Sequence, residues 1–305
     1  MHRLSFEGHE LVLLAEDIAK AKERLAGLKG VSFVKGDLLN VSADVLTDAM
    51  AGCGAVVHLA ALLDYGAPEE KIMAVNAGGT EKVARAAENA RVKRFVFMSS
   101  TSIYHRPPLL PIDEEQLPTP MNAYGRSKLA AEKALEKTKL NYIFIRAPAI
   151  YGPEFAEGFG QVLKMVKKGN MPIVGSGKNR MPFIHVDDVV QALILAVKTK
   201  ESREAFIVSS GETMTQEECL NGIAEILEAN KPSLHVPALL LYAAAWLDGL
   251  RAALGGKRFL RKEYVDGLVE DRTFDISKAE KMLGFHPKVS FKEGVTETAK
   301  ALLRK

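Results

Sequence analysis

Cysteine and net charge are both scarce in this sequence. Its 305 residues include two cysteines, Cys53 and Cys219, whose positions fit neither a metal-ligand spacing nor a C-x-x-C motif. This argues against a disulfide framework or a structural zinc site, and it favours a reducing, cytoplasmic compartment. The formal net charge of +3 is too small to indicate a nucleic-acid partner.

Long hydrophobic runs are missing as well. The most apolar stretch, residues 236–247, is too short for a bilayer and is followed by Asp248. We therefore expect a buried helix there and no integral membrane span. No cleavable targeting segment is visible at the N-terminus. With 47% hydrophobic and 26% charged residues, the chain can bury a substantial core and build a smaller second lobe.

Strand-like and helix-like stretches alternate along the chain. The strand-like stretches are Leu11 to Leu14, Val31 to Val34, Ala55 to Leu59, Phe95 to Met98 and Tyr142 to Ile145. Apolar residues recur at helical spacing between them, for example at Val83, Ala86, Ala87 and Ala90. This order predicts an α/β fold in which a parallel sheet has helices on both faces.

Two helix boundaries can be predicted near the C-terminus. A helical segment that starts at Asp275 is expected to end at Gly284, because glycine suits a helix C-cap. Ser290 and Glu293 have the spacing of a capping box, which predicts the start of the last helix.

Tyr124 and Lys128 stand four residues apart at the start of a helix-like segment, about one element after Ser100. At that spacing both side chains lie on one helical face, so the lysine can stabilise the phenolate form of the tyrosine. Lowering the pKa of a phenol by about three units takes roughly 4 kcal/mol of charge stabilisation. A lysine and an oxidised nicotinamide, both positive, can supply it. The three residues therefore indicate hydride transfer.

The Y-x-x-x-K pattern alone is weak, and the segments around it carry the interpretation. Ser99-Ser100 and Ile103-Tyr104 follow one apolar run, Arg146 to Pro153 follow another, and Phe183 to Val189 open a further helix. In combination, and from the first residues to the last, the sequence resembles the extended short-chain dehydrogenase/reductase superfamily, in its NAD-dependent epimerase/dehydratase group.

The resemblance implies a Rossmann-like doubly wound parallel sheet and a smaller C-terminal lobe that binds the substrate. We expect residues 1–152 to form the dinucleotide-binding domain, with residues 183–210 returning to it. Residues 153–305 are expected to form mainly the substrate lobe.

One part of the family pattern is missing. Members begin with a strand and a glycine-rich turn, G-x-x-G-x-x-G, which brings the backbone close to the cofactor pyrophosphate. Here residues 2–11 look like the end of the first helix running into the second strand. We interpret Gly52, Gly54, Gly78 and Gly79 as ordinary turn glycines.

The missing first strand would lie at the centre of the sheet, so its loss is expected to split the sheet. We favour a start codon assigned too late, or a truncated gene, with about 15 to 20 residues absent. The alternative is a natural departure in which the second and fourth family strands pair directly. Dinucleotide binding would then be weakened or lost.

The resemblance assigns the chemistry to three side chains. Ser100, with Thr101 as its backup, would hydrogen-bond the reacting oxygen. Tyr124 would take or give the proton, and Lys128 would hold the ribose and tune the phenol. His185 is expected to order a loop through a satisfied hydrogen bond.

Cofactor contacts are implied after several predicted strands. Asp37 matches the acid that hydrogen-bonds the adenine, although a turn acid that caps the next helix is an alternative interpretation. Asn76 matches an asparagine that supports the active-site strands. The further implied contacts are Leu38, Leu59, Ala60, Ala61, Tyr124, Lys128 and Pro148.

The preference for NAD or NADP depends on the end of the first visible strand. Glu16 stands where NADP-specific relatives often carry an arginine, and Ala15 stands where NAD-specific relatives usually carry an acid. A carboxylate there would repel a 2′-phosphate, so we expect NAD, with NADP as the alternative. A solvated carboxylate at a helix start is the competing interpretation of Glu16.

The C-terminal part looks like the 3β-hydroxysteroid dehydrogenase, dihydroflavonol reductase and hopanoid-associated epimerase branch. We expect an NAD(P)-dependent oxidoreductase or epimerase that acts on an apolar secondary alcohol or ketone, with docking at a membrane surface. A nucleotide-sugar epimerase or dehydratase is the alternative, for which Arg180, Arg251 and Arg258 are candidate diphosphate ligands. A truncated or non-catalytic protein that senses a dinucleotide is an alternative of another class. A homodimer would be usual for the group.

Overall fold

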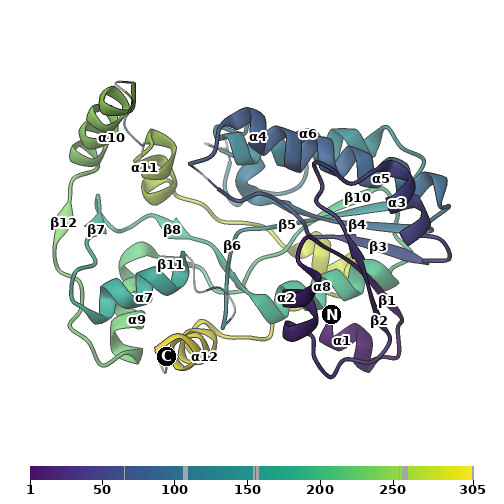
Figure 1. The fold of residues 1–305 in the computed structure, drawn as a ribbon. Helices are drawn as coiled ribbons and strands as arrows, with labels where there is room; N and C mark the ends of the chain where they lie inside the picture. The colour runs from purple at the N-terminus through teal and green to yellow at the C-terminus, as the bar shows by residue number, and fades with distance from the viewer. Residues whose placement is uncertain are drawn as a thin grey trace.

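The computed structural model describes residues 1–64, 66–105, 109–153, 155, 158–253, 255 and 260–303. A parallel sheet has helices on both faces, and a second lobe lies to one side of it (Figure 1). The predicted α/β class and Rossmann-like arrangement are therefore confirmed.

The main sheet has four parallel strands in the order β10-β5-β4-β3. Their bounds are β3 Ala55–His58, β4 Arg94–Ser100, β5 Tyr142–Ala147 and β10 Glu204–Ile207. The apolar runs predicted β3, β4 and β5. They did not predict β10, which has only 4 residues.

Alternate side chains of β4 pack against opposite faces, as expected for a strand that is buried on both sides. Phe95 and Phe97 pack in one apolar cluster with α5 and α6, whereas Val96 packs in another with α8. The bounds of these helices are α5 Gly79–Asn89, α6 Ala123–Glu136 and α8 Val186–Lys198. The same face of the sheet as α5 also carries α3 (Ala43–Ala49) and α4 (Glu69–Met73) (Figure 1).

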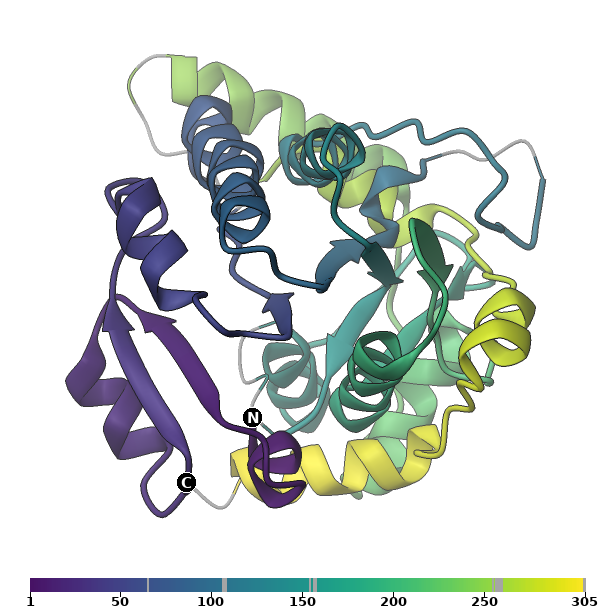
Figure 2. The same cartoon turned by 90° about the vertical axis from the view of Figure 1, so that its right-hand side faces the viewer.

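A separate parallel pair is formed by β1 (Leu11–Ala15) and β2 (Val31–Lys35), with α1 (His2–Phe6) before it and α2 (Ile18–Arg24) between the strands. Figure 2 shows this pair standing apart from the main sheet. Within the described ranges, no strand joins β1 to β3. The predicted split of the sheet is therefore confirmed, and the alternative of direct pairing between these two strands was wrong.

The split leaves the β1–β2 pair poorly buried. Neither strand contains a fully buried residue. Val12 is 42% exposed and Leu14 is 37% exposed, although strands inside a doubly wound sheet are normally covered on both faces. The β1–β2 pair thus lacks the packing that a central strand would provide.

The interpretation of Gly78 and Gly79 as turn glycines was wrong. Gly78 ends the π-helical segment η1 (Ala74–Gly78), and Gly79 begins α5. A Cβ on Gly79 would lie 3.2 Å from the Leu38 Cβ. The missing side chain therefore lets the loop after β2 pack closely on the helix.

The second lobe has its own apolar core, in which α7, α9 and α12 pack together with Tyr151. Its elements are α7 Phe159–Lys167, α9 Gln216–Ile226, α10 Ala238–Ala253, α11 Lys262–Val269 and α12 Phe291–Leu303. Three short strand pairs accompany them, namely β6 (Ala149–Tyr151) with β9 (Phe183–His185), β7 (Ile173–Val174) with β12 (His235–Val236), and β8 (Arg180–Met181) with β11 (Met214–Thr215). The division of the chain into two domains stays a prediction.

The helix expected over residues 236–247 is present as α10, but the expectation that it is buried was wrong. Leu239 is 76% exposed and Trp246 is 65% exposed, because α10 packs mainly against α11 at the outer end of the lobe (Figure 1). Among the described residues, no helix combines the length and the hydropathy needed to cross a bilayer.

Both helix boundaries predicted near the C-terminus are confirmed. Gly284 adopts the left-handed conformation, with φ 67°, directly after the π-helical segment η3 (Ala279–Leu283). Ser290 Oγ accepts a hydrogen bond from the Glu293 amide at 3.3 Å, and the Glu293 carboxylate accepts one from the Ser290 amide at 3.2 Å. This reciprocal pair is the predicted capping box at the start of α12.

Candidate active site

The predicted site residues follow the carboxyl ends of parallel strands. Ser100 ends β4, Pro148 follows β5, and residues 59–61 follow β3. Because these three strands are parallel neighbours, their carboxyl ends meet at one edge of the main sheet. In this register Ser100 lies opposite Ala147. This edge is the candidate active site.

Helix α6 begins close to this edge. Asn122 caps the helix by accepting a hydrogen bond from the Gly125 amide at 2.7 Å. A Cβ on Gly125 would lie 2.2 Å from the Ser102 carbonyl oxygen. Only glycine therefore allows the first turn of α6 to approach the segment that follows Ser100.

Lys128 lies under the half-buried Tyr124. Its ammonium Nζ donates a hydrogen bond to the Met98 carbonyl of β4 at 2.7 Å and lies 5.6 Å from the centroid of the Tyr124 ring. The Lys128 side chain is 2% exposed. The predicted helical face is thus present, and it meets the strand that carries Ser100.

Burial lowers the pKa of Lys128 from 10.5 to about 8, while the negative charge of Glu132 acts in the opposite direction. Lys128 is therefore still mainly protonated at neutral pH. A positive charge in this poorly hydrated place favours the anionic form of a neighbouring phenol.

Ser100 begins a short 3₁₀ helix, η2 (Thr101–Ile103). Its Oγ accepts a hydrogen bond from the Ser102 amide at 3.1 Å and donates one to Ser102 Oγ at 2.9 Å. The neighbouring hydroxyl of Thr101 donates to the Ala147 carbonyl at 3.4 Å and is buried. Redirecting the Ser100 proton would break only the bond to Ser102 Oγ, whereas redirecting the Thr101 proton would break the bond to the Ala147 carbonyl of β5.

Asn76 lies in the π-helical segment η1, a kind of distortion that is frequent at functional sites. Its Oδ1 accepts from the Leu62 amide at 2.6 Å, and its Nδ2 donates to Ser127 Oγ at 2.9 Å. Ser127 in turn donates to the Tyr124 carbonyl at 2.8 Å. Asn76 therefore ties the loop after β3 to the first turn of α6, and it acts on the site through other residues.

A buried ion pair beneath the site was not predicted from the sequence. Arg146 of β5 donates to both carboxylate oxygens of Glu132, at 3.0 and 2.7 Å, and to the Tyr104 hydroxyl at 2.6 Å. The signal was available, because Glu132 follows Lys128 at the spacing by which Lys128 follows Tyr124. Tyr124, Lys128 and Glu132 therefore share one face of α6.

His58 is a second buried residue that the sequence did not single out. Its Nε2 lies 2.9 Å from Thr80 Oγ1, and Thr80 donates its own proton to the Asn76 carbonyl at 2.5 Å. His58 Nε2 must therefore carry the proton in this hydrogen bond. Burial, with a smaller effect of the Lys128 charge, lowers the pKa of His58 to about 3, so the ring is neutral.

The residues expected near the adenine lie on the separate β1–β2 pair. Asp37 accepts from the Leu39 amide at 3.0 Å and from the Asn40 side chain at 2.7 Å, so its carboxylate orders a turn. Helix α3 is capped instead by Ser42. The Leu38 side chain is buried in the core, and Glu16 is exposed after β1.

The small residues after β3 are accessible. Leu59 is 49% exposed, and Ala60 and Ala61 are exposed as well. Pro148 is half-buried between β5 and β6. A ligand lying along this edge of the sheet would therefore meet the backbone of residues 59–61 directly.

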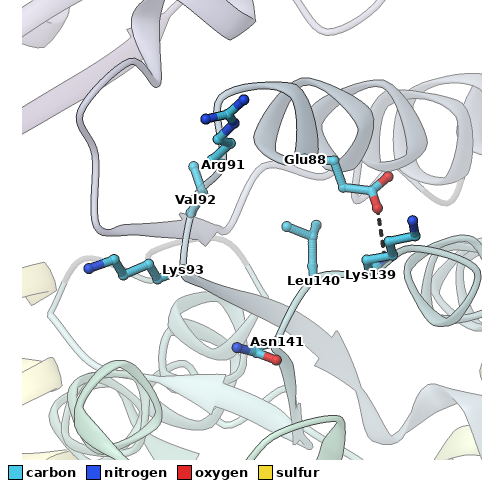
Figure 3. A pocket seen from close by; sticks show the side chains of 7 residues that line it. All are labelled: Glu88, Arg91, Val92, Lys93, Lys139, Leu140 and Asn141. Atoms are coloured by element: carbon cyan, nitrogen blue, oxygen red, sulfur yellow. Dashed lines mark hydrogen bonds between the residues drawn. The ribbon is translucent and has the colours of Figure 1, made fainter.

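A surface pocket of about 450 Å³ lies elsewhere, at the amino ends of β4 and β5 (Figure 3). The residues around it are Glu88, Arg91, Val92, Lys93, Lys139, Leu140 and Asn141. Strand direction places this pocket at the edge of the sheet opposite Ser100. None of the predicted catalytic residues lines it.

Comparison with known proteins identifies the family. Residues 1–209 match the NAD dependent epimerase/dehydratase family. A UDP-glucose 4-epimerase of Vibrio cholerae is 29% identical over 310 residues, which cover 96% of this chain and 90% of the relative. Short-chain dehydrogenase/reductase family 42E member 1 of Xenopus laevis is 28% identical, with 97% of this chain and 84% of the relative covered.

Both predicted branches occur among the relatives. A 3beta-hydroxysteroid-dehydrogenase/decarboxylase of Arabidopsis thaliana is 28% identical, with 93% of this chain and 71% of the relative covered. The relatives therefore include proteins named for sugar nucleotides and proteins named for sterols.

Solved structures show the same fold. MoeE5 in complex with UDP-glucuronic acid and NAD has a TM-score of 0.77 at 23% identity, with 99% of this chain and 94% of that chain covered. The UDP-glucose 4-epimerase of Thermotoga maritima has a TM-score of 0.77 at 21% identity, with the same coverage of both chains. The expected family and its cofactor class are confirmed, since the chain belongs to the NAD-dependent epimerase/dehydratase family.

Proposed function

We propose that this chain catalyses hydride transfer between NAD and the carbon of a secondary alcohol or ketone, with Tyr124 as the acid/base. The observation that carries the proposal is the pair on α6. The Lys128 ammonium is buried, held by the Met98 carbonyl, and 5.6 Å from the Tyr124 ring centroid. A dehydrogenase would release the ketone, whereas an epimerase would return the hydride to the other face of the ketone.

Tyr124 moves the proton in this mechanism. In the oxidative direction its phenolate accepts the proton of the substrate hydroxyl while the hydride leaves the same carbon. In reduction the phenol gives the proton back. Lys128 stabilises the phenolate, and Ser100 turns its hydroxyl from Ser102 Oγ toward the reacting oxygen of the substrate.

The residues on the nicotinamide side fit NAD, which accepts or returns the hydride when it is bound. Lys128 presents an ammonium for the ribose hydroxyls, while the exposed small residues at 59–61 and Pro148 leave room along the strand ends. On the adenine side, Asp37 and Glu16 follow β2 and β1. The exposed Glu16 carboxylate supports NAD over NADP, because it would repel a 2′-phosphate.

For the substrate we favour an apolar alcohol or ketone over a sugar nucleotide. Two of the candidate diphosphate ligands already have acidic partners. Arg180 donates to Asp271 at 2.9 and 2.5 Å, and Arg251 donates to Asp248 at 2.7 Å. The third candidate, Arg258, lies outside the described residues. A sugar nucleotide would have to displace these pairs.

The split sheet favours a second candidate function, namely dinucleotide binding without turnover. The adenine-side residues Asp37 and Glu16 follow the separate β1–β2 pair and not strands of the main sheet. Calorimetry with NADH separates the two functions when it is combined with turnover. Binding without turnover supports the second, and turnover supports the first.

We also propose that the protein works in the cytoplasm, in contact with a membrane surface, and that it forms a homodimer. Two free cysteines, Cys53 and Cys219, suit a reducing compartment. Equilibrium sedimentation in the presence of NAD would test the dimer.

Tyr124→Phe tests the catalytic role. We expect turnover of the preferred substrate, chosen between UDP-glucose and a 3β-hydroxysteroid by the amount of product formed, to fall by about 100-fold or more. Tyr142→Phe is the matched control, because Tyr142 begins β5 at the opposite edge of the sheet. Both variants should keep the wild-type circular dichroism. Activity of Tyr124→Phe within about threefold of Tyr142→Phe would remove Tyr124 from the mechanism.

A further inference from the structure

Helix α10 exposes an apolar face at the outer end of the second lobe (Figure 1). The exposed members of this face are Leu239, Leu240, Ala243, Ala244, Trp246, Leu247 and Leu250. At 3.6 residues per turn they cover about 160° of the helix circumference, and Arg251 lies within the same arc near the C-terminal end of the helix. We call these seven residues the α10 apolar face.

The opposite side of α10 faces the protein. Ala245 is buried, and the Tyr242 hydroxyl donates a hydrogen bond to the Asp266 carboxylate of α11 at 2.8 Å. The helix is thus held in the lobe by one side while its most apolar side chains face outward. A surface helix of a globular protein normally has the reverse arrangement.

Charge distinguishes between the possible occupants of the α10 apolar face. Residues 238–269, from the start of α10 to the end of α11, contain five basic residues and three acidic residues, Asp248, Glu263 and Asp266, of which Asp266 is buried. Among the basic residues that the structure describes, Lys262 is exposed at the start of α11, and Arg251, which pairs with Asp248, has its side chain 52% exposed at the end of the apolar face. A second copy of the chain would bring like charges together here, whereas an anionic lipid surface complements them.

We propose that the α10 apolar face docks on an anionic lipid surface, with the helix lying parallel to the membrane plane. A helix of 16 residues is about 24 Å long and cannot cross a hydrocarbon core of about 30 Å. Leucines and a tryptophan on one face, with basic residues at its border, are typical of an interfacial helix. The inference rests on the proposed location at a membrane surface but not on the proposed chemistry, which the vesicle experiment does not measure.

Trp246 is the only tryptophan of the chain, so its fluorescence reports on this face alone. We expect phosphatidylglycerol-containing vesicles to shift its emission to shorter wavelength and to sediment the protein. Vesicles of pure phosphatidylcholine should have a much smaller effect. Because the attraction is partly electrostatic, raising the salt from about 0.1 M to 1 M should weaken sedimentation by about tenfold.

The double variant Leu239→Glu/Leu247→Glu tests the face itself. Both leucines are exposed, at 76% and 58%, so the variant should keep the wild-type melting temperature while losing vesicle binding. Leu117→Glu is the matched control, because Leu117 is 84% exposed outside the second lobe and its variant should still bind. An unchanged emission with anionic vesicles, or equal binding by the double variant, would overturn the proposal. A shift that depends on protein concentration without lipid would assign the face to a second copy instead.

Discussion

The burial of the Lys128 ammonium at the centre of the candidate site is energetically unfavourable. A pKa lowered from 10.5 to about 8 means that its charged form is less stable than in water by roughly 3 kcal/mol. The Met98 carbonyl and the Phe97 ring, whose centroid is 4.8 Å from Nζ, offset part of this cost. A buried cation with a lowered pKa is typical of a functional site.

The buried pair of Glu132 and Arg146 gives a prediction for stability. Glu132→Gln should lower the free energy of unfolding by about 3–5 kcal/mol, because it leaves Arg146 buried without its anionic partner. Replacing both residues, as Glu132→Gln/Arg146→Met, should recover at least half of that loss. Urea unfolding of the single and double variants measures both values.

The exposed pair of Glu69 and Arg126 is the matched control for this cycle, because Arg126 lies on the same helix. Its side chains are 45% and 40% exposed, so Glu69→Gln should cost less than about 1 kcal/mol. An equal cost for Glu132→Gln and Glu69→Gln would contradict the assigned burial of the inner pair.

His58 gives a prediction for pH dependence. Its folded pKa of about 3 lies below the usual 6.5, so its contribution to stability is complete above pH 6.5 and is lost as the pH falls toward 3. Between pH 7 and pH 5 this loss amounts to about 2 kcal/mol. His58→Gln keeps a donor for Thr80 but does not titrate, so its stability should fall less over that range.

Unfolding by urea at both pH values, for wild type and His58→Gln, measures this difference. The acid-sensitive loss must be smaller in the variant. Parallel losses would show that the pKa of His58 is not lowered in the folded protein.

At the residue scale, the spacing of residues along one helix predicted which side chains share a face. Contacts between different elements could not be predicted from the sequence. Tyr124 and Lys128 could be predicted because one helical turn relates them. The partner of Glu132 is Arg146 on β5, and that of His58 is Thr80 on α5. These pairs depend on how the elements pack, which local sequence does not specify.

At the scale of elements, the β1–β2 pair is the weakest part of the fold. A sheet of two strands is marginally stable in water, and this pair contains no fully buried residue. We expect its backbone amides to exchange with deuterium at least about 100-fold faster than those of β4 and β5. Hydrogen exchange followed by mass spectrometry compares the two sheets within one sample. Equal protection of both would show that the pair is stabilised by contacts outside its own ladder.

The apolar runs predicted three of the four strands of the main sheet, because strands buried on both faces are almost continuously apolar. β10 escaped prediction because it begins with Glu204 and so lacks the continuous apolar run of β3, which also has 4 residues. The burial of α10 was predicted wrongly because composition alone was used. Its composition resembles that of a core helix, and only the packing shows that the apolar side faces outward.

At the scale of the whole molecule, the fold class and the split of the sheet were predictable, because both follow from the order of the elements. The helix pattern and the missing glycine-rich turn were visible in the sequence. The assembly of the second lobe was not predictable, since its core joins α7, α9 and α12 from distant parts of the chain. The edge that unites Ser100, Tyr124 and Lys128 followed from the resemblance and from strand order, whereas the supporting contacts of Asn76 needed coordinates.

The division between β1 and β3 also affects how the protein behaves in concentrated solution. Along the described chain, β3 has a partner on one side only, and so does β1. Each strand therefore has one edge without a ladder partner among the described residues, and the exposed Val12 lies on β1. Such borders recruit extended peptides of any origin, including those of neighbouring molecules, and they make intermolecular β-pairing the characteristic route by which this protein would aggregate.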